Sequence, residues 1–483
     1  MTSALKSRPA RVSDKISSAT AKLRKIALSG PFMFFAVGLN FLLYQLDCIN
    51  AIIVMNALAI VLFLVCFRDV LPCLLPFLSV CFGTINYYSL TPDGLKKLLP
   101  LAAIGAVALV LHMVIYPVKK EDIRIGKQFW SMFAIGVAAT LAGANLVNAE
   151  TYFSLKNVYY VLALGFGALA AYVFVLNYLP SDKKAAKKEF SACIYFGGLF
   201  GVLQMAALLY AVLSGKEPVE FLARQRYRNN FAALMLMLAP FSFYQSFAGN
   251  RRFLGYFMGV LQAVSACVTL SRAGFVTAIA VIAACGVFCI LFSDYKNRKF
   301  YVKTFVVTVI CAGLVLVLAD NYFDILSKRF DGAGSDVRTK IWKLGFSVFK
   351  EHPLLGAGWM AEGNSEYVST GSFSIYWYHN SFVQIAANTG MLGILCYGFG
   401  YVQKIYSIIS KPFTAFKFFV AVTFGGYMMM NMLHPIEFTP VPYLILMTIA
   451  FAAMEVFDEK ATDGEKLKFM CKSEIAAYYP SSK

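Results

Sequence analysis

Long apolar segments separated by short polar connections run through almost the whole of this chain. Windows of about twenty residues, the length of helix that crosses a bilayer, lie at 27–44, 49–67, 71–89, 98–117, 129–147, 157–179, 190–213, 230–248, 253–270, 274–292, 303–319, 381–403, 413–433 and 439–456. The first two windows, and the two around residue 272, are short or closely joined. The pattern therefore predicts an all-α polytopic membrane protein with about 12–14 transmembrane helices.

The composition agrees with a membrane protein and argues against a nucleic-acid partner. Only 14% of the 483 residues are charged and the mean hydropathy is +0.64, whereas soluble domains carry about 25% charged residues. The net charge of +18 would suit nucleic acid. The basic residues, however, form short clusters between apolar windows, which is the pattern of membrane topology signals.

The Lys/Arg asymmetry of the connections predicts the orientation. With the N-terminus inside, the cytoplasmic connections carry Lys119-Lys120, Lys183-Lys184, Arg251-Arg252, Lys296 to Lys303, Lys404 and Lys411, as the positive-inside rule requires. The predicted segments are a basic cytoplasmic tail at 1–26, transmembrane helices at 27–319, an extracytoplasmic catalytic loop at 320–379, transmembrane helices at 380–457 and a cytoplasmic tail at 458–483.

The loop of about sixty residues at 320–379 is too long to serve only as a connection, and it is the part of the chain where soluble chemistry can take place. Ser335 or Asp336 can cap a helix that runs to about Lys350. Its apolar residues recur at helical spacing, so we expect one face to lie on an apolar surface. Arg338 and Trp342 share a face. Trp342 is either a packing residue or a platform for a sugar.

Several arginines violate the predicted topology and therefore need another explanation. Arg272 is the only charged residue between Phe253 and Phe292, and an arginine near a membrane boundary costs at least a few kcal/mol unless it is paired or hydrated. Arg224, Arg226 and Arg228 precede Asn230 and an apolar window. Guanidinium groups at these places can bind phosphate. The alternatives are a topological anchor for Arg272 and a solvated cluster at the headgroups for the other three.

His379 ends an aromatic run and directly precedes an apolar window. An imidazole can accept a proton near neutral pH, and the adjacent Asn380 can orient a substrate or the loop. A lone histidine at an interface is more often structural, as we expect for His112 and His352. His434, which faces the same side near Glu437, is the competing candidate.

The motifs that are missing narrow the chemistry. The sequence has no His-Glu-x-x-His motif, no Gly-x-Ser-x-Gly motif and no P-loop. No predicted outer loop carries an Asp-x-Asp pair that would hold a divalent metal on a diphosphate, and the long loop contains no cysteine. We therefore expect no cofactor and no metal, with arginines supplying the positive charge for a phosphate ester.

Taken in order, these motifs resemble the superfamily of O-antigen ligases and O-antigen polymerases of bacterial envelopes. The resemblance rests on Ser271-Arg272, Arg338-x-x-x-Trp342, Pro353-Leu-Leu-Gly356-x-Gly358, and His379-Asn380 followed by Gly390-x-x-Gly393, and it covers roughly residues 220–400. The sequence departs from the family pattern at Asn388-Thr389, where an acidic residue is frequent, and at Asn229-Asn230, where a proline often intervenes. Both departures leave the subfamily, and hence the acceptor, open.

The resemblance implies a metal-independent, inverting glycosyltransferase with a GT-C-like fold in the bacterial cytoplasmic membrane. Such enzymes transfer a glycan from an undecaprenyl-diphosphate carrier to an acceptor hydroxyl on a glycan or lipid at the outer face of the bilayer. By this resemblance His379 would be the general base, and Arg272 and Arg338 would stabilise the departing diphosphate. Arg226, Arg228, Asn230, Trp342 and Asn380 would contribute to substrate binding.

Other classes of function account for part of the pattern. A flippase for lipid-linked oligosaccharides, or another polysaccharide transporter, would explain the many spans, but transporters place ionisable groups near the midplane and often show repeated halves. A membrane acyltransferase would use the His379-Asn380 pair and leave the arginines without a task. A polysaccharide-export scaffold without catalysis is the remaining alternative.

Overall fold

The computed structural model describes residues 20–84, 92–144, 158, 160–180, 182–218, 228–249, 251–318, 334–359, 378–438 and 441–458. Within these ranges the protein is helical and contains no β-strand, so the predicted all-α class is confirmed. The α-helices are α3 (Gly30–Gln45), α4 (Ile49–Cys66), α5 (Leu74–Thr84), α6 (Pro92–Ile115), α7 (Phe129–Leu141), α10 (Gly167–Tyr178), α11 (Lys183–Leu213), α13 (Arg228–Ala248), α14 (Arg252–Val268), α15 (Arg272–Phe292), α16 (Tyr295–Leu318), α18 (Gly334–Glu351), α19 (Ser381–Ile409), α20 (Ala415–Asn431) and α21 (Val441–Asp458). Short 3-10 helices lie at Leu71–Cys73 (η1) and Lys120–Asp122 (η2), and a π-helix at Val161–Phe166 (η3) precedes α10.

Every apolar window predicted from the sequence contains one of these helices. Among the described residues, 6 helices are long and apolar enough to cross a membrane, or up to 7 if the bent pair Thr20–Ala27 and Gly30–Gln45 is one span. Shorter apolar helices accompany them. The chain is therefore a polytopic membrane protein, and the total of 12–14 spans stays a prediction.

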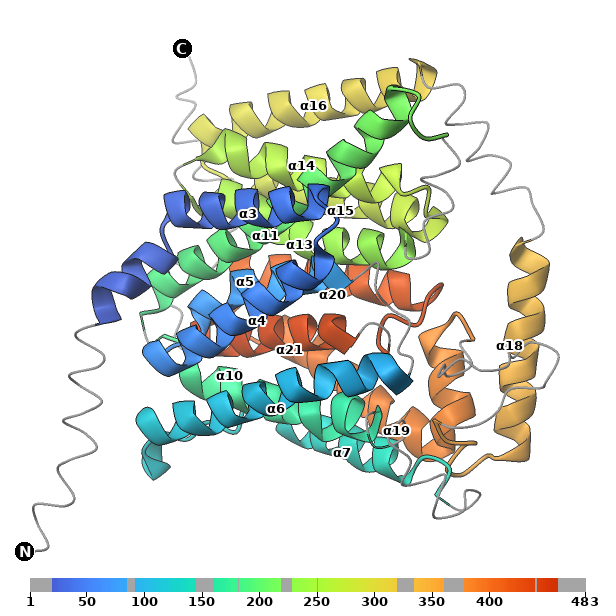
Figure 1. Cartoon of the computed structure of the whole chain (residues 1–483). Coiled ribbons are helices and arrows are strands. Elements are labelled where there is room, and N and C mark those ends of the chain that lie inside the picture. The colour runs from blue at the N-terminus through green and yellow to red at the C-terminus, as the bar shows by residue number, and fades with distance from the viewer. Residues whose placement is uncertain are drawn as a thin grey trace, which may run out of the picture.

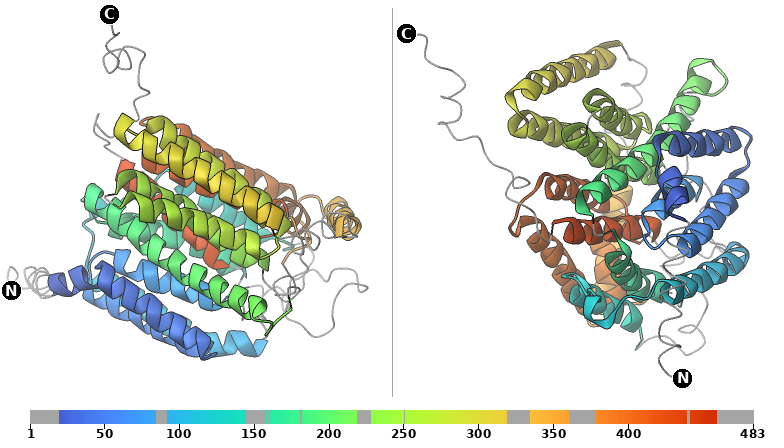
Figure 2. Two further views of the ribbon diagram at one scale, coloured as in Figure 1. Left: turned by 90° about the horizontal axis from the view of Figure 1, so that it is seen from above. Right: turned by 90° about the vertical axis from the view of Figure 1, so that its left-hand side faces the viewer.

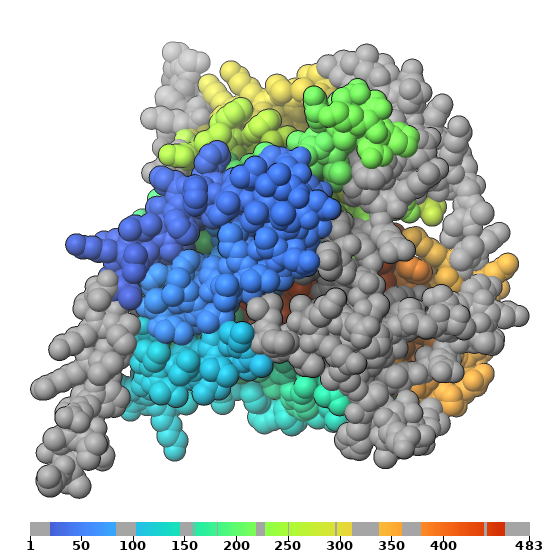
Figure 3. Space-filling view, viewed as in Figure 1, coloured from blue at the N-terminus to red at the C-terminus, as the bar shows by residue number. Residues whose placement is uncertain are grey.

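The long helices run side by side, and α13 lies at the centre of the bundle (Figure 1, Figure 2). Helices α11, α14, α15 and α20 all pack against α13, whose middle is buried continuously from Asn230 to Tyr244. The N-terminal helices α3 and α4 form the blue part of the face seen in Figure 3. Apolar residues exposed on the outer helices, such as Phe34, Phe35 and Val114, are in keeping with contact with lipid.

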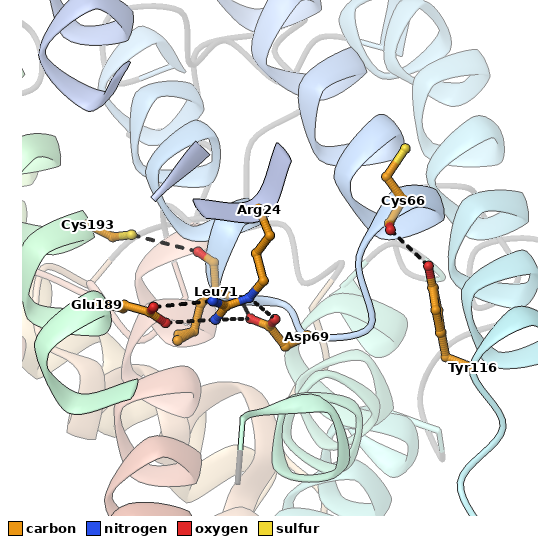
Figure 4. Close-up of polar contacts among 7 residues, drawn as sticks. All are labelled: Arg24, Cys66, Asp69, Leu71, Tyr116, Glu189 and Cys193. Atoms are coloured by element: carbon orange, nitrogen blue, oxygen red, sulfur yellow. Dashed lines mark hydrogen bonds and ion pairs between the residues drawn. The ribbon is translucent and has the colours of Figure 1, made fainter. Parts of the chain in front are cut away.

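One end of the bundle is held together by an arginine with two acidic partners (Figure 4). Arg24 forms ion pairs with Asp69 and with Glu189, the second at 2.7 Å. These residues come from the helix Thr20–Ala27, the connection between α4 and η1, and the first turns of α11. The three-way contact fixes the N-terminal helices to the rest of the bundle.

Helix α18 lies across the opposite end of the bundle, roughly perpendicular to the long helices (Figure 1). As its apolar spacing predicted, one face packs on the beginning of α19. The residues of this cluster are Ile341, Trp342, Leu344 and Val348 on α18, and Tyr378, Val383 and Ala387 at the start of α19. Gly345 permits the approach, because a Cβ atom there would collide with the side chain of Val383.

Helix α19 is broken at Gly390, which has φ 63° and ψ −157°. The segment Pro353–Gly358 lies against the break and supplies the hydrogen bonds that the helix cannot make. The amides of Ala357 and Gly358 donate to the carbonyls of Ala387 and Asn388 at 2.9 Å. In return, the amides of Met391 and Leu392 donate to the carbonyls of Pro353 and Leu354 at 2.8 and 3.1 Å. Gly356 and Gly358, both with positive φ, form the tight turn predicted from the sequence.

Candidate functional site

The residues singled out from the sequence gather at the end of the bundle that carries α18. Arg228 and Arg272 are the first residues of α13 and α15, Arg338 lies on α18, and His379 directly precedes α19. These segments are far apart in the chain, yet the charge of Arg272 acts on Arg338 and the charge of Arg338 acts on His379. The geometry therefore brings the predicted catalytic residues into one site.

The connection between α14 and α15 holds Arg272 in place. Leu270 takes a positive φ of 57°, which reverses the chain direction. The Ser271 hydroxyl then caps α15 by accepting from the amide of Gly274 at 3.1 Å, and it donates to Asn229 Oδ1 at 2.7 Å. An N-cap of this kind satisfies an otherwise unpaired amide. It also joins the start of α15 to the start of α13, so Arg272 projects from a fixed point.

Arg338 lies near Arg272, and the two guanidinium groups repel each other. Burial, followed by the charge of Arg272, lowers the pKa of Arg338. Neither arginine forms an ion pair with an acidic residue that the structure describes. Two partly buried cations held together in this way form a site that an anion would stabilise.

His379 lies in the field of these arginines. Its backbone has a φ of 53°, a strained conformation for a residue other than glycine. Burial, followed by the charge of Arg338, lowers the pKa of His379 from its ordinary value of 6.5. The imidazole is therefore neutral at pH 7. Its Nδ1 atom is buried and has no hydrogen-bond partner among the described residues.

His434, in the connection after α20, is the second imidazole of the site. Its ring centroid lies 5.8 Å from that of His379, and its Nε2 atom is 2.8 Å from Asn230 Oδ1. Because this oxygen only accepts, Nε2 carries the hydrogen. Burial, together with the proximity of His379, Arg338 and Arg228, lowers the pKa of His434 to about 3. His434 is thus held neutral in one orientation.

Asn380 and Asn230 form contacts within the protein. Asn380 caps α19 by accepting from the amides of Phe382 and Val383 at 2.8 and 3.2 Å, and it donates to the carbonyl of Met432 at 3.0 Å. Asn230 is buried, and its carbonyl accepts from the Tyr443 hydroxyl at 2.7 Å. Both asparagines position the loop ends around the histidines, and their part in substrate binding stays a prediction.

Comparison with known protein families connects this geometry to a class of proteins. Residues 257–398 match the family model described as O-antigen ligase. This segment is similar to the O-antigen ligase family. The O-antigen ligase domain therefore runs from α14 into α19 and contains Arg272, Arg338 and His379, and the resemblance inferred from the sequence is confirmed. Searches of curated proteins and of solved structures gave no match.

The remaining residues of the predicted site differ in where they lie. Arg228 precedes the domain and lies close enough to act on His434. Trp342 belongs to the apolar cluster between α18 and α19, and its Nε1 atom is buried without a hydrogen-bond partner among the described residues. Arg224 and Arg226 lie outside the described residues.

Sequence reasoning named His434 only as a competitor of His379, and it did not connect His434 with Asn230. Both histidines in fact lie side by side, and His434 follows the O-antigen ligase domain. The 2.8 Å hydrogen bond between His434 and Asn230 joins the connection after α20 to the first turn of α13. No local pattern encodes such a contact. The only signal was the small number of histidines, which is 4 in the chain.

Proposed function

We propose that the protein is a surface polysaccharide ligase or polymerase: a metal-independent, inverting glycosyltransferase that transfers a glycan from an undecaprenyl-diphosphate carrier to an acceptor hydroxyl. The observation that carries this proposal is the placement of the neutral imidazole of His379 beside Arg338 and Arg272 inside the O-antigen ligase domain. The acceptor is a second lipid-linked glycan for a polymerase, or the lipid A core of lipopolysaccharide, a wall polymer or a protein for a ligase.

In the proposed reaction the histidine acts on the acceptor hydroxyl and the arginines act on the diphosphate. His379 takes the proton of the acceptor hydroxyl as the oxygen attacks the anomeric carbon of the donor from the side opposite the diphosphate. The bond between the anomeric carbon and the diphosphate oxygen breaks, and its electron pair leaves with the diphosphate. Arg272 and Arg338 stabilise this charge, and the proton on His379 is afterwards released to the product diphosphate or to water.

The repulsion between Arg272 and Arg338 favours the reaction. In the free protein each guanidinium raises the energy of the other. A diphosphate that accumulates negative charge between them relieves this repulsion, and it does so most strongly when the leaving group has fully developed its charge. The arginines thus stabilise the transition state more than the ground state.

The distribution of basic residues supports an extracytoplasmic site. The end of the bundle opposite α18 carries Lys183, Lys187, Lys188, Arg251, Arg252, Lys411 and Lys417 at helix ends and connections. By the positive-inside rule this end faces the cytoplasm. We therefore place the N- and C-termini in the cytoplasm and the site at the outer face of the bacterial cytoplasmic membrane.

The proposal is tested with the full chain in lipid nanodiscs, a defined undecaprenyl-diphosphate glycan and each acceptor in turn. We expect a glycosylated product from the wild type, and a loss of about 100-fold or more in rate for His379→Gln, Arg272→Gln and Arg338→Gln. Lys343→Gln, on the exposed side of α18, is the matched control and should keep full activity. Wild-type turnover in the His379→Gln variant would exclude His379 as the base.

A deletion strain separates a transferase from a flippase. Cells that lack the protein should accumulate lipid-linked glycan at the outer leaflet, because the donor arrives there and is not consumed. Accumulation at the inner leaflet would instead identify the protein as a transporter of the lipid-linked glycan.

A further inference from the structure

A second polar site lies at the end of the bundle opposite α18, where α7 and α20 begin and α10, α19 and α21 end. A cavity of about 410 Å³ opens there. Its lining includes four basic residues, Arg124, Lys127, Lys411 and Lys417, and two acidic residues, Glu455 and Asp458. The lining therefore carries an excess of positive charge, and none of these residues belongs to the site with His379.

The acidic residues of the cavity are occupied by contacts within the protein. Asp458 forms an ion pair with Lys187 at 3.2 Å and accepts from the Thr414 hydroxyl at 2.9 Å. Glu455 accepts from the Tyr172 hydroxyl at 2.7 Å and from the amide of Lys127 at 2.8 Å. These bonds hold both carboxylates in place, and the four basic residues of the lining outnumber them.

The segment Ile123–Lys127, which carries two of the basic residues, is fixed by its backbone. The amide of Arg124 donates to Asn177 Oδ1 at 2.8 Å, and the Asn177 amide returns a bond to the carbonyl of Arg124 at 2.9 Å. The carbonyl of Lys127 accepts from Gln403 Nε2 at 3.1 Å. At Gly126, with φ 77°, a Cβ atom would collide with the Tyr172 hydroxyl. A ligand that binds here pays little to order this segment.

Apolar residues alternate with the basic ones along the same segment. Ile123 and Ile125 are 51% and 54% exposed, and Trp130, the second residue of α7, is 67% exposed. Such a surface suits an anionic ligand with an apolar tail. The isoleucines would contact its acyl chains, and Arg124 and Lys127 would contact its negative head. Basic pockets between helix ends on the cytoplasmic side of membrane proteins bind anionic headgroups in this way.

We propose that this cavity binds a phosphate group, that of an anionic phospholipid or free phosphate, with Lys127 and Lys411 as its charge partners. The proposal is independent of the transfer reaction at the other end of the bundle. Lys411 precedes α20 and Lys127 precedes α7. A phosphate between them would bridge the two connections and stabilise the packing of α7 against α19.

The test measures thermal unfolding of the full chain in detergent free of phospholipid. The probes are dioctanoyl phosphatidylglycerol, dioctanoylglycerol without a phosphate, and inorganic phosphate. Phosphatidylglycerol should raise the Tm of the wild type and dioctanoylglycerol should not. Protection by phosphatidylglycerol alone identifies a lipid headgroup as the occupant, and protection by inorganic phosphate as well identifies any phosphate.

The variant Lys127→Gln/Lys411→Gln should bind phosphatidylglycerol about tenfold or more weakly. Lys119→Gln/Lys120→Gln removes the same charge from exposed residues outside the cavity and should bind as the wild type does. The proposal would be overturned if all three proteins bound phosphatidylglycerol equally, or if both variants lost affinity for it equally. It would also be overturned if neither phosphate probe shifted the Tm of the wild type.

Discussion

The rings of His379 and His434 lie with their centroids 5.8 Å apart and their planes inclined by 33°, although one precedes α19 and the other follows α20. They differ in their surroundings. The Nδ1 atom of each ring is buried without a hydrogen-bond partner among the described residues, but only the ring of His434 is bonded to a described side chain through its Nε2 atom, to Asn230 Oδ1. This asymmetry suits a division in which His379 exchanges a proton with the acceptor and His434 shapes the wall beside it.

Replacement of Arg338 should change the pH dependence as well as the rate. Burial and then Arg338 lower the pKa of His379, so the neutral base persists below pH 6.5 and activity is lost only as pH falls through the lowered pKa. Arg338→Gln removes the second cause. The pKa then rises, and the acidic limb of the profile moves to higher pH, measured as kcat/KM against pH on the residual activity.

The Lys343→Gln control tests whether this shift is specific, since it removes a positive charge from the exposed side of the same helix. Its profile should coincide with that of the wild type. An acidic limb that stays in place in Arg338→Gln would show that His379 does not set the pH dependence.

His434→Gln should make the protein less sensitive to acid. The folded-state pKa of His434 is about 3, while the unfolded chain binds the same proton near the ordinary value of about 6.5. The stabilisation by neutral His434 is therefore complete above pH 6.5 and is lost as pH falls toward 3, by about 2 kcal/mol at pH 5. The difference in Tm between pH 7.5 and pH 5 should shrink in the variant.

His352→Gln offers the comparison for this measurement, because His352 is a half-exposed residue after α18. Its Tm should fall with pH as steeply as that of the wild type. The same slope in His434→Gln would mean that protonation of His434 does not contribute to acid unfolding.

Gly390→Ala should prevent correct folding of α19. Its positive φ of 63° disfavours any side chain, and a Cβ atom would collide with the backbone of Leu354 and Gly356. We expect loss of monodisperse protein after detergent extraction. Gly398→Ala lies in the same helix with nothing within 4 Å of the added Cβ, so it should be tolerated or stabilise the helix by about 0.5–1 kcal/mol. Equal yields of both variants would contradict the role of the break.

Ser271→Ala should slow the reaction without removing a catalytic residue. It deletes the cap of α15 and the bond to Asn229, at a cost of about 1 kcal/mol in stability, and it loosens the position of Arg272. We expect kcat to fall about tenfold with little change in KM, because the proposed role of Arg272 is to stabilise the leaving group. Ser265→Ala removes a hydroxyl that bonds only within its own helix, to Leu261, and should keep the wild-type kcat.

Hydropathy predicted the helices well, because a helix that spans a bilayer consists of about twenty consecutive residues that are mostly apolar. The helix α18 and its apolar face were predicted for a similar reason, since Ile341, Leu344 and Val348 repeat at helical spacing. Arg272 was found because an isolated charge near a membrane boundary is costly. Each of these signals is local.

The contacts that complete the site are not local. The bond between His434 and Asn230 joins α13 to the end of α20, and the capping bonds of Asn380 extend to Met432. The sequence showed glycines at 356, 358 and 390 but not that the first two lie against the third. Contacts between residues far apart in the chain depend on how the helices pack, and a single sequence does not reveal this packing.

The break at Gly390 also bears on how the chain is inserted into the membrane. The carbonyls of Ala387 and Asn388 and the amides of Met391 and Leu392 depend on Pro353–Gly358 for their hydrogen bonds, and lipid offers no replacement. With the outward orientation that we propose for this end of the bundle, the first part of α19 is therefore stable only after residues 353–358 have crossed the bilayer and folded back. Translocation of the polar loop and insertion of the span that follows it become one step of biogenesis, so a chain with a stalled loop would expose an incomplete helix to membrane quality control.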